Sequence, residues 1–475
     1  MTHGANPSAG SSRGRAHRAC ASAVCLAAAL ALVDCGGSKS APESAPPPNV
    51  LLIVADDQSA TDLGAYGNPA VATPHLDALA RDGMSFDRAY APEAMCTPSR
   101  SSIYTGLEPI RHGAHRNHSF VDAGVQSIPH YFAPLGFRVA LAGKTHVGPA
   151  ESFPFELLPG SYIGPGQVRI DAQLDDIRAV IRDGSRPFFL VVADSRPHSV
   201  AGEPGGWPEP VRHSPSEVIL PPHLVDTAET RSERAAYYDL IAALDGLVGT
   251  ILADLDASGR SRDTIVLYVS DHGAGFPFEK WTNYDAGLRV PLIVRWPGRI
   301  APGTRSDALV SLVDLLPTLL DLVGAPAAPL DGRSFAAVLR GEASAHRDRV
   351  FAMHTNLGIL HGGIYPIRSV RDRRWHYLRN LAPENLFTNN ITEVDEGGWS
   401  SWVERAESNP FAAERVARYQ RRTGEELYDL ASDPAELVDL AADPAYDEIR
   451  AELAAALDAW MQSGGDRGIP EETEP

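Results

Sequence analysis

Four apolar runs in this 475-residue chain each end at a polar cluster, and this pattern constrains the fold more than any other feature. The runs cover residues 50–55, 138–142, 188–193 and 265–269. Continuous apolar runs are typical of strands that are covered on both faces, as in a parallel sheet. Helical patterns lie between the runs, for example over 174–182 and 235–255. This alternation predicts an α/β domain with a mostly parallel sheet.

The residues that follow these runs are candidate ligands and cations. They are Asp56 and Asp57 after the first run, Lys144 and His146 after the second, His198 after the third, and Asp271 and His272 after the fourth. Because ligands of such sheets bind beyond the carboxyl ends of the strands, we expect these side chains to converge. Three carboxylates offer the hard oxygens that Ca²⁺ or Mg²⁺ prefers, and without a cation they would repel one another. The pattern therefore predicts a divalent-metal site, with His272 as its less expected member.

Residues 96–100 (CTPSR) are typical of a helix start, since Pro98 fits the first turn, where a missing N–H costs little. Cys96 would then lie at the helix amino end, where free N–H groups favour an anion. Arg100 would lie one turn further along the same face. From these five residues alone, a packed structural cysteine is an equally good interpretation.

The charge of the chain restricts its ligands. The net charge of −19 argues against a nucleic-acid binder, and a polyanionic substrate would need a local positive pocket. The chain has only three lysines against 39 arginines, yet Lys144 and Lys280 both fall inside candidate site motifs. Arginine does not freely replace the compact, movable charge of lysine, so both are candidate anion-binding residues.

The first 48 residues are expected to direct export. A basic start and an apolar run over 19–33 predict a signal peptide over 1–35, because the run is short for a membrane span. The run ends in a Leu-Val-Asp-Cys-Gly string that resembles a lipoprotein signal with Cys35 as the lipidated residue. Residues 36–48 form a Gly/Ser/Pro linker. We therefore expect a periplasmic or cell-surface protein that touches a membrane only through a lipid at Cys35.

Seven segments together resemble signatures of the type I sulfatase family. They are 49–58 (NVLLIVADDQ), 73–83 (TPHLDALARDG), 96–106 (CTPSRSSIYTG), 143–148 (GKTHVG), 270–273 (SDHG), 312–320 (LVDLLPTLL) and 426–434 (ELYDLASDP). The stretches GKTHVGP and FPFEKWTN are most similar to the N-sulfoglucosamine sulfohydrolase, or heparan N-sulfatase, branch. The resemblance implies an alkaline phosphatase-like fold, with a large, mostly parallel sheet between helices and a smaller C-terminal α+β domain with an antiparallel sheet.

We place the catalytic domain at 49–345 and the C-terminal domain at 346–475. Residues 374–378 alternate like a half-exposed strand, and 426–430 also have a strand pattern. Residues 449–461 have the pattern of an amphipathic helix. The stretch 384–409 has no strong periodicity and is expected to be a loop or insertion. The basic run 111–118 is expected to be a loop near the site mouth.

The resemblance also implies the chemistry, which is hydrolysis of a sulfuric ester or sulfamate in a sulfated sugar. A formylglycine-generating enzyme would oxidise Cys96 to formylglycine, whose hydrate attacks sulfur. One Ca²⁺ per chain would be bound by modified Cys96 together with Asp56, Asp57, Asp271 and His272. Arg100 and Lys144 would hold formylglycine, and His146 would activate or orient it. His198 and Lys280 would grip the sulfate, whose negative charge must be neutralised during transfer.

Several alternatives stay open at this point. Lys280 stands where the branch has arginine, and His272 stands where it has asparagine. Arg196 stands where the branch has an acidic residue near the substrate amine, so an O-sulfated sugar is an alternative to a sulfamate. Other hypotheses are a phosphonate or phosphate diester hydrolase of the same superfamily and a non-catalytic sulfoglycan-binding protein. The acidic body would repel a long polyanion, which favours action at a chain end.

Overall fold

The four apolar runs form neighbouring parallel strands at the centre of an eight-stranded sheet. The computed structural model describes residues 47–164, 166–199, 207 and 210–469. The strands are β1 (Asn49–Asp56), β4 (Arg138–Gly143), β6 (Phe188–Pro197) and β7 (Thr264–Ser270), and they lie in the order β7-β1-β6-β4. All three pairings are parallel, so the four carboxyl ends meet at one edge of the sheet. The expected signal peptide, Cys35 and most of the linker lie outside the described residues.

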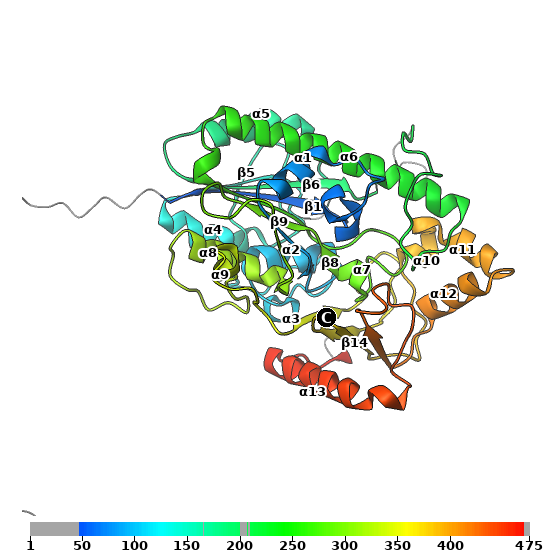
Figure 1. Ribbon diagram of the computed structural model, residues 1–475. Coiled ribbons are helices and arrows are strands. Elements are labelled where there is room, and N and C mark those ends of the chain that lie inside the picture. The colour runs from blue at the N-terminus through cyan, green and yellow to red at the C-terminus, as the bar shows by residue number, and fades with distance from the viewer. Residues whose placement is uncertain (1–46, 165, 200–206, 208–209, 470–475) are drawn as a thin grey trace, which may run out of the picture. The chain divides into compact units, whose positions relative to one another are not determined.

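Both faces of this sheet are buried, as the continuous apolar runs predict. Side chains of a strand alternate between faces. Accordingly Leu51 and Ile53 of β1 belong to one hydrophobic core, whereas Val50, Leu52 and Val54 belong to another. Helices α1 (Pro74–Arg81), α5 (Leu174–Arg182) and α6 (Ala228–Ala257) lie on one side of the strands in Figure 1. Helices α2 (Cys96–Thr105), α3 (Pro109–His112), α4 (Ile128–Phe132), α8 (Leu315–Leu322) and α9 (Ala336–Leu339) lie on the other.

The remaining strands extend the sheet and form a small second one. The full order is β10-β2-β9-β7-β1-β6-β4-β5, with β2 (Met84–Phe86), β5 (Glu156–Leu157), β9 (Leu292–Arg295) and β10 (Thr304–Ser306). Only the β9 pairings with β2 and β7 are antiparallel. Strands β3 (Ala89–Tyr90), β8 (Arg289–Val290) and β11 (Val310–Ser311) form a three-stranded sheet, and α7 (Asp285–Leu288) precedes β8. The predicted α/β fold with a mostly parallel sheet is confirmed.

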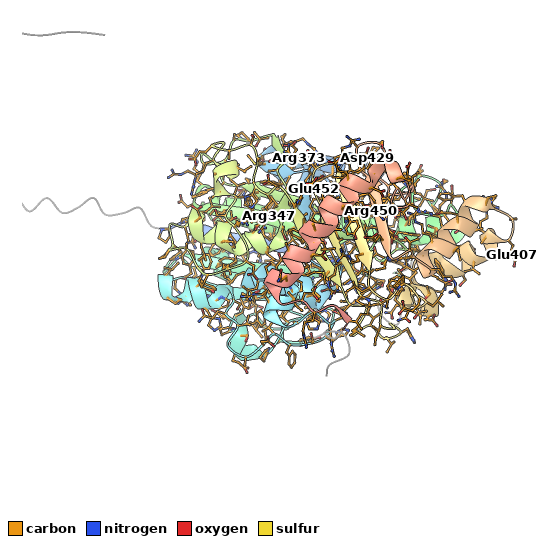
Figure 2. All side chains as sticks on the ribbon, turned by 90° about the horizontal axis from the view of Figure 1, so that it is seen from below. Arg347, Arg373, Glu407, Asp429, Arg450 and Glu452 are labelled. Carbon is orange, nitrogen blue, oxygen red and sulfur yellow. The ribbon has the colours of Figure 1, made fainter. Side chains whose placement is uncertain are left out.

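The C-terminal region contains the expected antiparallel sheet. Its strands are β12 (Val350–His354), β13 (Ile367–Arg371), β14 (Trp375–Asn380) and β15 (Glu425–Asp429), in that order. Helix α13 (Asp447–Gly464) packs its buried Leu453 and Leu457 against Val370 and Leu427 of the sheet. Figure 2 shows Arg450 and Glu452 on this helix; Arg450 pairs with Glu425 of β15 at 3.0 Å. The division of the chain at residue 345 stays a prediction.

The prediction of a loop over 384–409 is wrong. This stretch contains α10 (Asn390–Val394), a 3₁₀ turn η9 (Glu396–Gly398) and α11 (Trp399–Ala406), followed by α12 (Pro410–Gln420). The Asn389 side chain caps α10 by accepting the Ile391 N–H. Trp399 and Trp402 are buried, and Trp399 lies against Tyr419 of α12. Aromatic packing between short helices, rather than a long periodic pattern, stabilises the segment.

Within the described residues, we find no helix with the length and hydropathy that a bilayer crossing requires.

Candidate active site

Cys96 is the first residue of helix α2, as its flanking residues predict. Met95 is extended just before the helix, and Pro98 lies in the first turn. The Cys96 thiol is 2% exposed; its sulfur lies 3.4 Å from Nε2 of His272 and 3.8 Å from Nζ of Lys144. The helix start therefore brings this sulfur to the carboxyl ends of β4 and β7.

Asp56, at the end of β1, is surrounded by cations. Its two carboxylate oxygens accept hydrogen bonds from Nζ of Lys144 at 2.5 Å and Nη2 of Arg100 at 3.0 Å. Nε of the same arginine donates to Asp271 at 2.8 Å. Burial opposes ionisation of Asp56, but Lys144 and Arg100 outweigh it and hold the pKa of this carboxyl well below its usual value. Asp56 is therefore ionised at neutral pH.

Asp57 has a separate set of partners. Its Oδ2 accepts a hydrogen bond from Nζ of Lys280 at 2.7 Å and lies 3.7 Å from Nε2 of His198. Its Oδ1 lies 3.4 Å from Nε2 of His272. Burial opposes ionisation, yet His198 and Lys280 lower the pKa of Asp57. Thus Lys280, 223 residues away along the chain, bonds directly to the Asp57 carboxylate.

Asp56, Asp57 and Asp271 offer the oxygens that a hard divalent cation prefers, whereas Cys96 and His272 add a sulfur and a nitrogen. One ligand atom each from Asp57, Cys96 and His272, and likewise from Asp56, Cys96 and Asp271, lie within 4.8 Å of one another. Asp57 Oδ1 is buried but accepts no hydrogen bond from the part of the chain that the structure describes. Its ion pair with His272, at 3.4 Å, offsets only part of the cost of burying it, so an additional partner would stabilise it. Burial disfavours protonation of His272, but Asp271 and Asp57 raise its pKa to about 9, so metal ligation by this imidazole would release a proton.

The loop that carries Lys280 is held by a buried network. Glu279, its neighbour, accepts hydrogen bonds from His223 at 3.1 Å, from Ser59 at 3.1 Å and from Arg234 at 3.5 Å. The Arg234 guanidinium also pairs with Asp62. These fully buried charges are paired, which limits the cost of taking them out of water.

Backbone strain is concentrated at this site. Asp57, His118, His146 and Trp281 have positive φ values of 67°, 61°, 51° and 68°. Residues with a side chain seldom adopt this left-handed conformation, and such strain is typical of functional sites.

A cavity of about 220 Å³ opens above the carboxylate cluster. Five of the predicted residues line it, namely Cys96, Lys144, His146, His198 and Lys280. Of the other five, Asp56 and Asp57 pair with Lys144 and Lys280, and His272 lies next to Cys96. Arg100 bonds to the Lys144 carbonyl and links Asp271 to Asp56. The structure therefore brings all ten predicted site residues together.

His118 is a cavity residue that sequence reasoning missed. In the basic run 111–118, His112 is buried and bonds to Ser102 and the Pro98 carbonyl, so its role is structural. His118, in contrast, lines the cavity, and its Nδ1 lies 2.7 Å from Nε2 of His146. The His118 N–H donates to Thr97, beside Cys96. The closely spaced histidines were the only sequence signal, and their spacing matches no standard metal motif.

Arg196 does not line the cavity, although the resemblance placed this position near the substrate amine. Its guanidinium pairs with Asp194 and Asp171, each at 2.7 Å. Neither Asp194 nor Asp171 lines the Cys96 cavity. The substitution of arginine for an acidic residue at this position therefore does not add a charge to the cavity wall.

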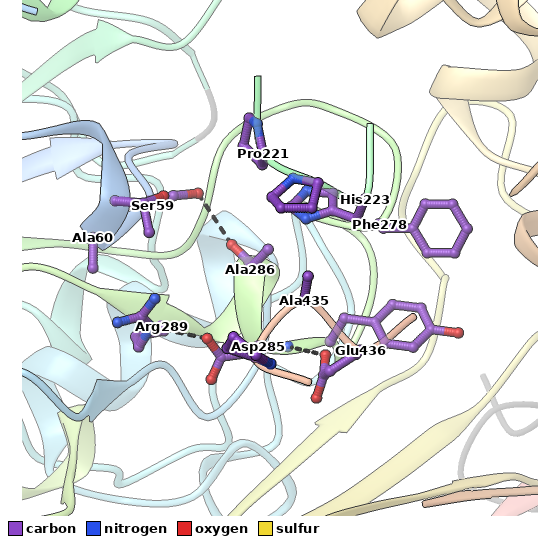
Figure 3. A pocket seen from close by; sticks show the side chains of 14 residues that line it. Ser59, Ala60, Pro221, His223, Phe278, Asp285, Ala286, Arg289, Ala435 and Glu436 are labelled. Atoms are coloured by element: carbon purple, nitrogen blue, oxygen red, sulfur yellow. Dashed lines mark hydrogen bonds and ion pairs between the residues drawn. The ribbon is translucent and has the colours of Figure 1, made fainter. Parts of the chain in front are cut away.

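A second cavity, of about 260 Å³, lies on the other side of the Lys280 loop and is shown in Figure 3. Its charged residues satisfy one another: Arg289 donates to Asp285 at 2.8 Å, and the Asp285 N–H donates to Glu436 at 2.7 Å. Its wall includes none of the ten predicted site residues. The Cys96 cavity is therefore the candidate active site.

Comparison with known proteins identifies the family. Residues 48–325 match the sulfatase family model, and residues 272–388 match the model for the C-terminal part of N-sulphoglucosamine sulphohydrolase. An ulvan-active sulfatase of Formosa agariphila is 31% identical over 423 residues, covering 88% of this chain and 81% of that protein. Human N-sulphoglucosamine sulphohydrolase is 31% identical over 463 residues, covering 87% and 90%. The chain belongs to the sulfatase family, and the predicted likeness to the N-sulfoglucosamine sulfohydrolase branch is confirmed.

Solved structures agree on the fold. A phosphonate monoester hydrolase of Agrobacterium radiobacter superposes with a TM-score of 0.67 at 23% identity, covering 88% of this chain and 96% of that one. A protein solved with its substrate D-glucosamine-2-N,6-O-disulfate superposes with a TM-score of 0.68 at 20% identity, covering 90% and 100%. At these identities the likeness establishes the architecture alone. The enzyme class, a sulfatase, comes from the family match.

Proposed function

We propose that this sulfatase is calcium-dependent and removes sulfate from a sulfated sugar through a formylglycine formed from Cys96. One observation carries the proposal: the Cys96 sulfur lies at a helix amino end, next to both ligand triads and within 3.8 Å of Lys144. Few structural cysteines have such surroundings. A formylglycine-generating enzyme would be the maturation partner.

Calcium would be held by Asp56, Asp57, Asp271, His272 and residue 96. When bound, the ion would supply positive charge against the sulfate and the nucleophile. As formylglycine, residue 96 would supply a hydrated aldehyde hydroxyl in place of a thiol. Arg100 neutralises Asp56 and Asp271 and fixes their orientation from beneath.

The remaining side chains divide the binding and proton-transfer work. Lys144 would hold the oxygen on residue 96, and Lys280 with His198 would bind the sulfate oxygens. Burial, together with Lys144, holds the pKa of His146 well below its usual value, so this imidazole is neutral. Its Nδ1 accepts no hydrogen bond from the residues that the structure describes, and in the proposed mechanism His146 would orient residue 96 or accept its proton. Burial lowers the pKa of His198, so its neutral imidazole would bind the sulfate by hydrogen bonding.

The size of the cavity favours action at a chain end. Ligand pockets for drug-sized molecules are about 300–1,000 Å³. The cavity of about 220 Å³ suits one sugar ring with its sulfate better than an internal segment of a polymer. The names of the two relatives, an ulvan-active sulfatase and N-sulphoglucosamine sulphohydrolase, refer to carbohydrate substrates. They support a sugar rather than an aryl sulfate as the natural substrate.

Two measurements test this function. Peptide mass spectrometry of protein made with the maturation enzyme should show residue 96 lighter by about 18 Da, the change from –CH₂SH to –CHO. Turnover of 4-nitrophenyl sulfate should exceed that of an aryl phosphonate and should be lost in Cys96→Ala. A fully unmodified thiol would favour a binding protein, and faster phosphonate turnover would favour a phosphonate or diester hydrolase.

We also propose export with a lipid anchor at Cys35, on the sequence pattern alone. Fractionation of expressing cells tests it, since Cys35→Ala should move the protein from the membrane fraction to the periplasm or the medium. Equal distribution of both forms would contradict the anchor.

A further inference from the structure

Part of the wall of the Cys96 cavity comes from the C-terminal region of the chain. Glu396, from η9, and Asn390, the first residue of α10, both line the cavity. Both lie beyond residue 388, where the matches to the two family models end.

The polar atoms of this wall are only partly satisfied. Glu396 Oε1 accepts one long hydrogen bond from Ser199, at 3.4 Å, and Oε2 accepts none from the described residues. Asn390 Oδ1 is buried and also has no partner there. Buried acceptors without donors destabilise the protein, so a ligand that donates hydrogen bonds to them would gain binding free energy.

Glu396 lies among the cations of this cavity. It is close enough to Lys280 to act on that lysine electrostatically, after Asp57 and Cys96. Ser199, which donates to Glu396, also bonds through its carbonyl to Nδ1 of His198 at 2.7 Å. A molecule that carries an anion with hydrogen-bond donors close to it matches this arrangement.

We propose that Glu396 and Asn390 form the sugar-recognition subsite of this enzyme. They bind the donors of the ring that carries the sulfate, which are an ammonium or hydroxyls. Leu360, which is 82% exposed and lines the same cavity, covers the C–H edge of the ring. The inference rests on the proposed sulfatase function and adds the class of substrate, a single amino or hydroxylated sugar with hydrogen-bond donors near its sulfate.

The test compares substrates with and without such donors. Glu396→Gln keeps the shape of the side chain and removes its charge. Glu393→Gln is the matched control, because Glu393 lies in the same segment but is exposed and bonds only to Thr392 among described residues. KM and kcat are measured with glucosamine 6-sulfate, glucose 6-sulfate, N-sulfoglucosamine and 4-nitrophenyl sulfate. Melting temperatures show that both variants fold.

We expect Glu396→Gln to raise KM for its preferred sugar about tenfold or more, as for loss of a charge-assisted hydrogen bond, with 4-nitrophenyl sulfate unchanged within about twofold. Glu393→Gln should change neither. If an ammonium is the donor, wild type prefers glucosamine 6-sulfate to glucose 6-sulfate and the variant loses this preference. If hydroxyls are the donors, the variant weakens both sugars alike.

If Glu396→Gln lost activity on the sugar and on the aryl sulfate to the same extent, Glu396 would act through Lys280 and the proposed subsite would be refuted. Unchanged kinetics in this variant would also refute it. So would a wild type that hydrolyses the aryl sulfate but none of the sugars. If wild type hydrolyses nothing, the proposed function fails instead. In that case, calorimetry on Cys96→Ser protein, with and without Glu396→Gln, measures the Kd values for glucosamine 6-sulfate and for inorganic sulfate. If Glu396→Gln abolishes the preference for the sugar over sulfate, the subsite is supported. If the preference is unchanged, the subsite is refuted.

Discussion

Replacement of Arg100 by methionine should expose how strongly the carboxylate cluster depends on its internal counter-charges. Arg100 is fully buried and donates to Asp271 at 2.8 Å, to Asp56 at 3.0 Å and to the Lys144 carbonyl at 3.3 Å. Methionine fills much of the same volume but donates nothing. Asp56 keeps its ion pair with Lys144, whereas Asp271 keeps His272 at 3.9 Å and the weaker influence of Lys144.

The expected loss can be worked out from these contacts. Removing one partner of a buried ion pair costs about 3–5 kcal/mol. With an unfolding entropy of about 2.1 cal/mol/K per residue, the compact unit over 46–475 loses roughly 1 °C of melting temperature per kcal/mol. We therefore expect a decrease of about 3–5 °C in a chelator. Saturating Ca²⁺ should shrink this decrease, because a bound cation replaces the lost charge and stabilises the variant by linkage.

Thermal unfolding of wild type and Arg100→Met, each with EDTA and with CaCl₂, measures both effects. Arg81→Met is the control, since Arg81 pairs with Asp82 at 3.5 Å on the surface and should shift the melting temperature by at most about 1 °C. If CaCl₂ raised the melting temperature of neither protein above its value in EDTA, the metal assignment would be refuted. A decrease no larger than that of the control would refute the electrostatic account of the cluster.

Two further predictions concern groups away from the metal ligands. His118→Ala should lower kcat/KM for 4-nitrophenyl sulfate about tenfold, because the His146 ring loses its 2.7 Å partner; unchanged kinetics would contradict this positioning role. Burial raises the pKa of Glu108 from 4.5 to about 8, so its contribution to stability is full below pH 4.5 and is lost as pH rises through 8. Glu108→Gln should accordingly gain on the order of 3 kcal/mol over wild type above pH 8, and melting curves at pH 5 and 9 that show a constant difference would contradict it.

Short-range patterns in the sequence were sufficient for the framework of the site. The run 50–55 alternates residues between two cores and ends at Asp56, which the backbone geometry of a strand alone dictates. Pro98 and its neighbours likewise fix the start of α2 at Cys96. Because parallel strands share one carboxyl edge, the convergence of the strand-end ligands also followed from the sequence.

The segment over 384–409 shows where such reasoning fails. Its helices are short, and they are stabilised by contacts such as Trp399 with Tyr419 and Trp402 with Thr230 of α6. Isolated helices of this length are only marginally stable in water, so the local sequence does not predict them. Glu396 consequently could not be assigned to the site from the sequence, although it lines the cavity.

The sequence by itself determined the parallel sheet, the start of α2 and the identities of the ten candidate residues, since these depend on backbone geometry and near neighbours in the chain. Only the tertiary structure decided the pairings: Arg100 between Asp56 and Asp271, Lys280 on Asp57, His118 against His146, and Glu396 in the cavity wall near Lys280. These contacts join segments up to hundreds of residues apart. They depend on how loops pack over the sheet edge, and that packing is fixed only when the whole unit folds.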